Sequence, residues 1–211
     1  MLEDIIDSSE VPVVRLNTIF RQAAKSKIIV NAHNVNEGKS FILDKSTNEQ
    51  DNDFFYINEL NKDKMLYQAI SLCSTRLASY GNYNFYKDMQ VLTPTKKGSL
   101  GTKELNKSLQ QALNPSSDLK DEKQYGEQVF RVGDRVMQVK NNYDIFWTKK
   151  EEHGEGIFNG EIGRIKNIDN EAKQVKIEYE DEKTAWYQYS ELDQIEHSYA
   201  VTIHKSQRKR I

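Results

Sequence analysis

The sequence predicts an α/β protein in which a parallel sheet with helices is combined with a small antiparallel β-barrel. Short apolar runs without alternation, Val11–Leu16 and Met89–Thr93, are typical of buried parallel strands, and segments of helical periodicity separate them. From Phe130 onward the pattern changes to short alternating strands, which favours a barrel. The apolar start of Ser198–Gln207 predicts one more buried strand after the barrel.

In the first half, Val11–Leu16 leads to Asn17 and Thr18, which are N-cap candidates for a short helical turn carrying Arg21 and Gln22. The elements expected after that turn are a helix from Ser26 to Gly38, a polar loop from Lys45, a strand over Asp53–Ile57, a long helix over Leu60–Tyr80, the strand Met89–Thr93 and a helix over Thr102–Leu113. Gly38 and Gly81 are expected at the ends of their helices.

The polar segment 116–128 marks a domain boundary. The expected barrel strands lie at Phe130–Val139, Gly156–Ile165 with a tight Asn-Gly turn, Val175–Tyr179 and Thr184–Tyr187. Between the first two, Lys140–Asp144 and Trp147–His153 are expected to form a flexible polar loop.

Composition narrows the function classes. With 30 basic and 32 acidic residues the net charge is −2, so any nucleic-acid contact has to come from local patches. The single cysteine, Cys73, lies in a helical pattern, which predicts a buried residue and excludes an internal disulfide. No apolar run approaches the roughly 18 residues that span a membrane, so we expect no membrane partner and a cytoplasmic setting.

The strongest candidate site is at the end of the chain. Donors and positive charges follow the last strand at Thr202, His204, Lys205, Ser206 and Gln207. In open α/β sheets ligands bind at the carboxyl edge of the strands. A strand that simply runs into a basic tail is the alternative interpretation.

Two further candidates also have ordinary alternatives. Arg21 could clamp a phosphate or be solvated in a first helical turn. After Met89–Thr93, the residues Thr93, Pro94, Thr95 and Lys96 open a loop that could bind phosphate oxygens or form a solvated turn.

The amides of Asn141 and Asn142 and the ring of Tyr143 could contact single-stranded nucleic acid or belong to a polar hairpin loop. His33 has no partner spaced to chelate a metal. Glu151, Glu152 and His153 could suggest a metal site, but adjacent residues on a flexible loop seldom converge, so we predict none.

Several of these segments are similar to the sequence motifs of one protein family. The chain resembles superfamily 1 DNA helicases of the RecD/TraA type, which include the alpha subunit of exodeoxyribonuclease V. Leu16-x-x-Ile-Phe-Arg-Gln22 is similar to motif IV, and Val91-Leu-Thr-Pro-Thr-Lys-Lys97 to the segment called motif IVa. The run from Val132-Gly-Asp-Arg to Tyr143 resembles the SH3-like insert, and Thr202-Ile-His-Lys-Ser-Gln207 resembles motif V.

The resemblance implies an incomplete RecA-like domain over residues 1–120 and 195–211, interrupted by an SH3-like barrel at 121–194. It implies that Arg21 and Gln22 contact ATP, with Arg21 acting in catalysis at the γ-phosphate. It also implies that Thr93–Lys96, Asn141–Tyr143 and Thr202–Gln207, except Ile203, contact single-stranded DNA.

A Walker A sequence and motif VI are missing, and Arg208–Ile211 replaces the glycine expected after Gln207. We therefore expect a truncated chain that binds no ATP or Mg²⁺ and is inactive alone, whereas its parent uses both to unwind DNA in the 5′→3′ direction. The expected partners are single-stranded DNA and the missing N-terminal RecA-like domain, and subunits of a nuclease complex are also compatible. The alternative is a stand-alone nucleic-acid-binding or adaptor module without enzymatic activity.

Overall fold

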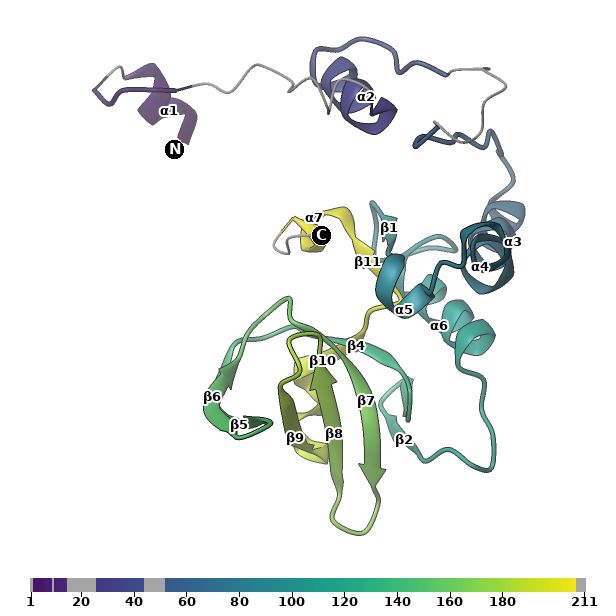
Figure 1. The fold of residues 1–211 in the computed structure, drawn as a ribbon, viewed down its shortest axis with the longest axis vertical. Helices are drawn as coiled ribbons and strands as arrows, with labels where there is room; N and C mark the ends of the chain where they lie inside the picture. Colours follow the sequence, from purple (N-terminus) through teal and green to yellow (C-terminus); the bar gives the residue numbers. More distant parts are fainter. Residues whose placement is uncertain (1, 9, 15–25, 44–51, 208–211) are drawn as a thin grey trace. The chain divides into compact units, whose positions relative to one another are not determined.

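The computed structural model describes residues 2–8, 10–14, 26–43 and 52–207. The chain forms two compact units, Met1–Asn58 and Glu59–Ile211. The first contains the helices α1 (Leu2–Asp7) and α2 (Lys27–Asn36), both drawn in purple to blue (Figure 1). The helix expected from Ser26 is confirmed: the Ser26 hydroxyl accepts a hydrogen bond from the Ile29 amide at 3.3 Å, and Gly38 has φ +74°.

Two predicted strands in this unit are wrong over the residues that can be compared. Neither residues 11–14 nor Asp53–Ile57 form a strand, and Val14 is 84% exposed. An apolar run becomes a strand only where another strand pairs with it, and the sequence of the run does not supply that partner. The second run instead contributes Phe54 and Tyr56 to an aromatic cluster, with ring centroids 6.2 and 5.3 Å from that of Phe41.

The helices of the second unit follow the predicted periodicity. The long helix expected over Leu60–Tyr80 is present as α3 (Lys62–Ser71), a π-helical turn η3 (Leu72–Arg76) and α4 (Leu77–Gly81). It ends at Gly81, one residue later than expected, and the C-cap residue Asn82 lies in the left-handed region with φ +55°. The short helix α5 (Phe85–Asp88) follows, and α6 covers Thr102–Leu113, the predicted range.

These helices cover a parallel pair of strands, β1 (Val91–Thr93) and β11 (Ala200–Thr202). The core between them is formed by Cys73, Phe85, Leu105, Leu109, Tyr199 and Ala200. Burial raises the pKa of the Cys73 thiol to about 11, so it is not a reactive thiolate near neutral pH. Cys73 is therefore the buried residue that its helical position predicts.

The barrel follows α6. Its strands are β2 (Glu122–Tyr125), β3 (Gln128–Arg131), β4 (Arg135–Gln138), β5 (Asn142–Lys149), β6 (Glu152–Ile157), β7 (Ile162–Asp169), β8 (Gln174–Tyr179), β9 (Thr184–Gln188) and β10 (Ile195–His197), with a 3-10 turn η4 (Tyr189–Gln194) before β10. Seven of them form one antiparallel sheet in the order β10-β4-β7-β8-β9-β5-β6, and β2 pairs with β3. The predicted combination of an α/β part with an antiparallel barrel is confirmed.

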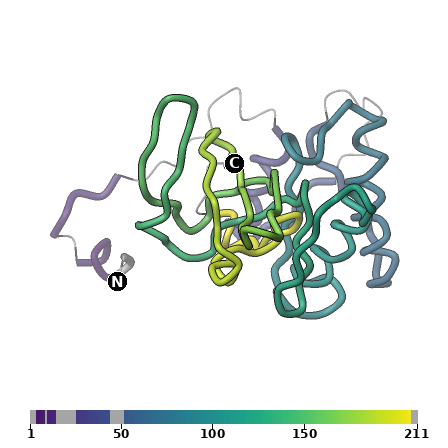
Figure 2. The backbone as a smooth tube through the Cα atoms, turned by 90° about the horizontal axis from the view of Figure 1, so that it is seen from below, coloured from purple at the N-terminus to yellow at the C-terminus, as the bar shows by residue number. Residues whose placement is uncertain are grey.

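One part of the barrel differs from its prediction. Trp147–His153, expected as a flexible loop, lies in the hairpin of β5 and β6, and Trp147 pairs with Gly154. This hairpin, drawn in green, extends from the edge of the barrel (Figure 2). A side chain at Gly154 would lie 2.6 Å from the Trp147 ring, so glycine is what allows the indole to cover the partner strand. The predicted Asn-Gly turn is present, and Gly160 has φ +100°.

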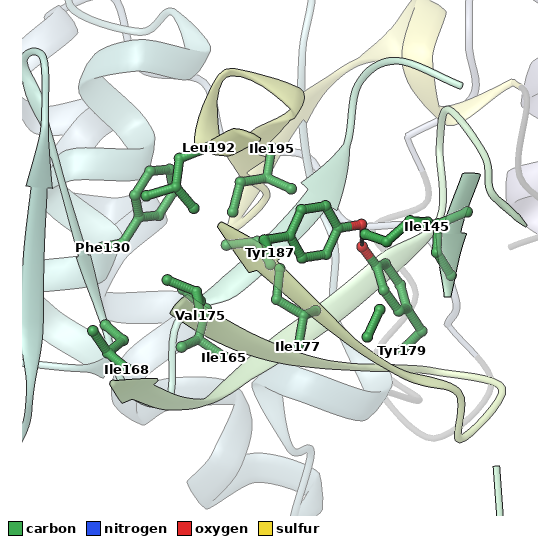
Figure 3. Packing of buried hydrophobic residues seen from close by; sticks show 13 residues of the cluster. Phe130, Ile145, Ile165, Ile168, Val175, Ile177, Tyr179, Tyr187, Leu192 and Ile195 are labelled. Carbon is green, nitrogen blue, oxygen red and sulfur yellow. Dashed lines mark hydrogen bonds between the residues drawn. The ribbon is translucent and has the colours of Figure 1, made fainter. Parts of the chain in front are cut away.

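The barrel core combines aliphatic side chains with Tyr179 and Tyr187, whose hydroxyl groups point toward each other (Figure 3). The Tyr187 hydroxyl donates to Gln138 Oε1 at 2.9 Å, so the Tyr179 hydroxyl, 2.6 Å from it, is the donor to Tyr187. Burial raises the pKa of both tyrosines, which therefore stay protonated. All three polar groups are thus paired inside the apolar core.

Candidate functional site

The parallel pair β1 and β11 brings two predicted site segments to one edge. Thr93 lies directly opposite Thr202 in the register of the two strands. Because the strands are parallel, the residues after Thr93 and the residues after Thr202 leave the sheet at the same, carboxyl-terminal edge (Figure 1). Thr93–Lys96 and Thr202–Gln207, far apart in the sequence, therefore lie together.

The loop after β1 is held by hydrogen bonds to its own backbone carbonyls. The Thr93 hydroxyl donates to the Leu100 carbonyl at 2.7 Å, and the Thr102 amide donates to the Thr95 carbonyl at 3.1 Å. A side chain at Gly101 would lie 2.6 Å from the Lys96 carbonyl group, so glycine is required where the loop closes onto α6. Lys96 is exposed.

On the β11 side, Thr202 is the N-cap of the short helix α7 (Ile203–Ser206). Its hydroxyl oxygen accepts from the Lys205 amide at 3.3 Å, which leaves the hydroxyl proton for another acceptor. His204 and Gln207 are exposed, whereas the Ser206 hydroxyl donates to the Ile203 carbonyl at 2.7 Å. Lys205 forms an ion pair with Glu196 at 2.9 Å.

The α6 side chain of Asn106 fixes the position of β11. Its amide nitrogen donates to the carbonyls of His197 and Ala200 at 3.1 and 3.0 Å, and its oxygen accepts from the Ala200 amide at 2.8 Å. The two bonds to Ala200 satisfy backbone groups that a two-stranded sheet leaves unpaired, and the third holds the end of β10. The carboxyl-terminal edge is thus attached directly to α6.

A small pocket lies at this edge. Its lining comes from both predicted segments, from α6 and from the barrel: Lys96, Thr102, Asn106, Met137, Glu196, His197, Ala200, Val201, Thr202 and Lys205. Its volume of about 20 Å³ suits about one water-sized group and excludes a nucleotide. The arrangement offers hydroxyl and cationic donors to a single oxygen atom of an anionic group.

Behind this edge, the carboxylate of Asp134 is fully buried and joins the barrel to the α/β part. One oxygen accepts from Asn114 Nδ2 at 2.7 Å and from the Tyr199 hydroxyl at 2.9 Å. The other accepts from Gln110 Nε2 at 2.6 Å, the Arg131 amide at 2.8 Å and His197 Nε2 at 3.0 Å. Burial, with the Asp134 carboxylate adding to it, raises the pKa of Tyr199, so its hydroxyl stays a donor.

Two arginines of the barrel strengthen the same junction. The buried Arg135 donates to the Met89 carbonyl at 2.8 Å and lies 3.5 Å from Glu180. The Arg164 guanidinium lies 4.3 Å from the centre of the Tyr86 ring. The barrel is therefore packed on the helices next to β1 and β11.

The predicted group Asn141–Tyr143 lies on the barrel, and none of its residues lines the pocket. The Asn141 oxygen accepts from the Asn159 amide at 2.9 Å, and the Asn142 amide donates to Gln194 at 2.9 Å. These side chains therefore shape the turn. Tyr143 is 65% exposed, and its ring contacts Phe158 edge to face.

Arg21 and Gln22 lie outside the described residues. Within the described ranges, no group of three or more histidine, cysteine or acidic side chains could hold a metal ion. No helix of the described chain is both long and apolar enough to cross a membrane. Sequence reasoning missed the role of Asp134, although an acidic residue after Gly133, among the apolar positions Phe130, Val132 and Val136, was a signal that could have found it.

The architecture defines a class: an α/β part, in which helices cover a parallel pair of strands, joined to a small antiparallel barrel. Residues 105–179 match the family model of the SH3 domain of ATP-dependent RecD-like DNA helicases. This match and the relatives described next confirm the resemblance of the chain to RecD-type superfamily 1 helicases.

The ATP-dependent RecD2 DNA helicase of Deinococcus radiodurans is 29% identical over 197 residues, which cover 93% of this chain and 23% of that protein. An uncharacterized protein of Methanocaldococcus jannaschii is 32% identical over 141 residues, covering 58% of this chain and 12% of that protein. The chain thus spans less than a quarter of the length of these curated relatives.

Among solved structures, the chain is similar to the Pif1 helicase from Bacteroides in complex with ADP-AlF3 and ssDNA. The identity is 13%, the match covers 92% of this chain and 43% of that chain, and the TM-score is 0.43. The Bacteroides Pif1 structure bound to ssDNA matches with a TM-score of 0.41 and 12% identity, covering 89% of this chain and 42% of that one.

Proposed function

We propose that this chain is part of an ATP-dependent 5′→3′ DNA helicase of the RecD type and that its β1/β11 edge grips single-stranded DNA. The observation that carries the proposal is the register of Thr93 opposite Thr202. Two separate segments thereby bring the Thr202 hydroxyl and the cations of Lys96 and Lys205 around one small pocket. Hydroxyl and lysine donors are the groups that bind a phosphodiester backbone without reading its sequence.

The proposal assigns residues 1–120 and 195–211 to the second RecA-like domain and 121–194 to the inserted barrel, with β10 extending the barrel sheet three residues past that boundary. In the whole protein, ATP and Mg²⁺ are held mainly by another RecA-like domain, and Arg21 and Gln22 complete that site from this chain. The chain alone then binds DNA but does not hydrolyse ATP. We place the whole protein in the cytoplasm, where it acts on DNA.

Within the DNA-binding surface, Thr202, His204, Lys205 and the exposed residues Pro94–Lys96 form the primary contact. Asn141 and Asn142 act indirectly, because their amides are engaged in holding the turns beside Tyr143. Tyr143 itself is exposed and offers a ring on which a base can stack.

The test is the salt dependence of single-strand binding. Lys96→Ala should weaken binding of a labelled oligothymidylate and make the slope of log K against log salt concentration shallower by about 0.7, because one phosphate contact is lost. Fluorescence anisotropy of the 211-residue chain over a range of NaCl concentrations measures both quantities.

The matched control is Lys166→Ala, which removes a lysine from the outer surface of the barrel, where it pairs with Glu178. It should leave the affinity and the slope as in the wild type. Equal effects of Lys96→Ala and Lys166→Ala would mean that binding is a diffuse property of the surface, and the proposal would fail.

A further inference from the structure

A carboxylate lies within the predicted DNA-binding surface. Glu196 Oε2 is 2.9 Å from Lys205 Nζ, and both side chains line the pocket together with Thr202 and Lys96. The Lys205 side chain is 23% exposed and the Glu196 side chain 47%. The surface proposed to bind an anionic strand thus contains a carboxylate, Glu196, that is paired with one of its cations, Lys205.

The backbones on both sides of this pair are anchored. Glu196 lies opposite Met137 in the ladder of β10 and β4, and the neighbouring His197 carbonyl accepts a hydrogen bond from Asn106. The Lys205 amide is held by the Thr202 hydroxyl. The ion pair therefore results from where β10 and α7 lie, and it does not depend on the arrangement of a loose loop.

The ion pair allows Lys205 to exchange the Glu196 carboxylate for a phosphate. Lys205 cannot offer its full charge to a phosphate while Glu196 neutralises it. Because the pair is partly exposed to solvent, it is weak enough for a phosphate to displace the carboxylate. The lysine is then shared between two anionic partners, of which only one belongs to the protein.

We propose that Glu196 sets the affinity of this edge for the phosphodiester backbone by competing for Lys205. In the free protein Glu196 holds the lysine, and in the complex the lysine turns to a phosphate. The inference rests on the proposed DNA-binding function. It adds a competing carboxylate that keeps the affinity for each phosphate low enough for the strand to be released. A motor that moves along a strand has to release each phosphate that it binds.

The experiment is a double-mutant cycle in the 211-residue chain, with affinity for the same oligothymidylate as the readout. Glu196→Gln should tighten binding about threefold to fivefold and make the salt slope steeper by up to about 0.7. In the Lys205→Met background the same substitution should change the affinity by less than about 1.5-fold, because the competitor has no lysine left to hold.

Glu178→Gln is the matched control, since Glu178 pairs with Lys166 on the barrel and does not line the pocket. It should leave the affinity unchanged. Equal gains from Glu196→Gln and Glu178→Gln, or an equal gain from Glu196→Gln with and without Lys205, would overturn the inference and leave only a general effect of charge.

The two proposals fail in different ways. If neither the wild type nor any variant binds the oligonucleotide, both the proposed function and the proposed role of Glu196 are wrong. If the wild type binds and Lys96→Ala weakens binding while Glu196→Gln has no effect, only the role of Glu196 is wrong. Thermal unfolding of each variant verifies that a change in affinity is not a loss of fold.

Discussion

Replacing Asp134 by alanine should lower the free energy of unfolding of the Glu59–Ile211 unit by about 3–5 kcal/mol. The substitution leaves five donors without their acceptor in a site where the carboxylate is 0% exposed. Each buried donor that loses its partner retains the cost of its desolvation. Urea unfolding followed by circular dichroism and by tryptophan fluorescence measures the change.

The matched control for this prediction is Asp144→Ala. Asp144 is an exposed aspartate of β5, so its removal should change the free energy of unfolding by no more than about 0.5 kcal/mol. A loss below about 1 kcal/mol for Asp134→Ala would contradict the account, because it would mean that the junction of barrel and helices does not depend on this carboxylate.

On the proposed function, Arg21→Ala in the whole protein should reduce ATP turnover by about 10³-fold while single-strand affinity stays close to that of the wild type. The reason is that a guanidinium at the γ-phosphate stabilises charge that develops only in the transition state of phosphoryl transfer. Steady-state ATPase assays at saturating single-stranded DNA, together with binding measured without ATP, separate the two effects.

Arg76→Ala is the control for Arg21→Ala, because Arg76 is an exposed arginine in the turn η3. Its turnover should match the wild type. Turnover of the Arg21→Ala variant within a factor of about three of the wild type would remove Arg21 from the ATP site, even if DNA binding by the β1/β11 edge were confirmed separately.

The elements that sequence could predict are those whose patterns are local. The leucines at four-residue spacing, followed by Asn114 and Pro115, predict the limits of α6, and alternating residues predict most of the barrel strands. The runs at Val11–Leu16 and Asp53–Ile57 show the opposite case. Whether an apolar run becomes a strand depends on a neighbouring strand, and over the described part of both runs none pairs with it.

The site was predictable in its parts, but its assembly was not. Donor-rich segments after Thr93 and at Thr202 were visible in the sequence, whereas their direct pairing depends on the topology of the sheet. The contacts of Asp134 with Tyr199, and of Glu196 with Lys205, depend on how the barrel returns to β11. No residue spacing reports such tertiary contacts.

The most direct measurement of the central claim is amide chemical-shift mapping of the ¹⁵N-labelled chain titrated with oligothymidylate. If the β1/β11 edge grips the strand, the largest shifts should occur together at Thr95, Lys96 and the residues from Thr202 to Gln207. Shifts confined to the barrel, for example to Asn141–Tyr143, or no shifts at saturating oligonucleotide, would contradict the account.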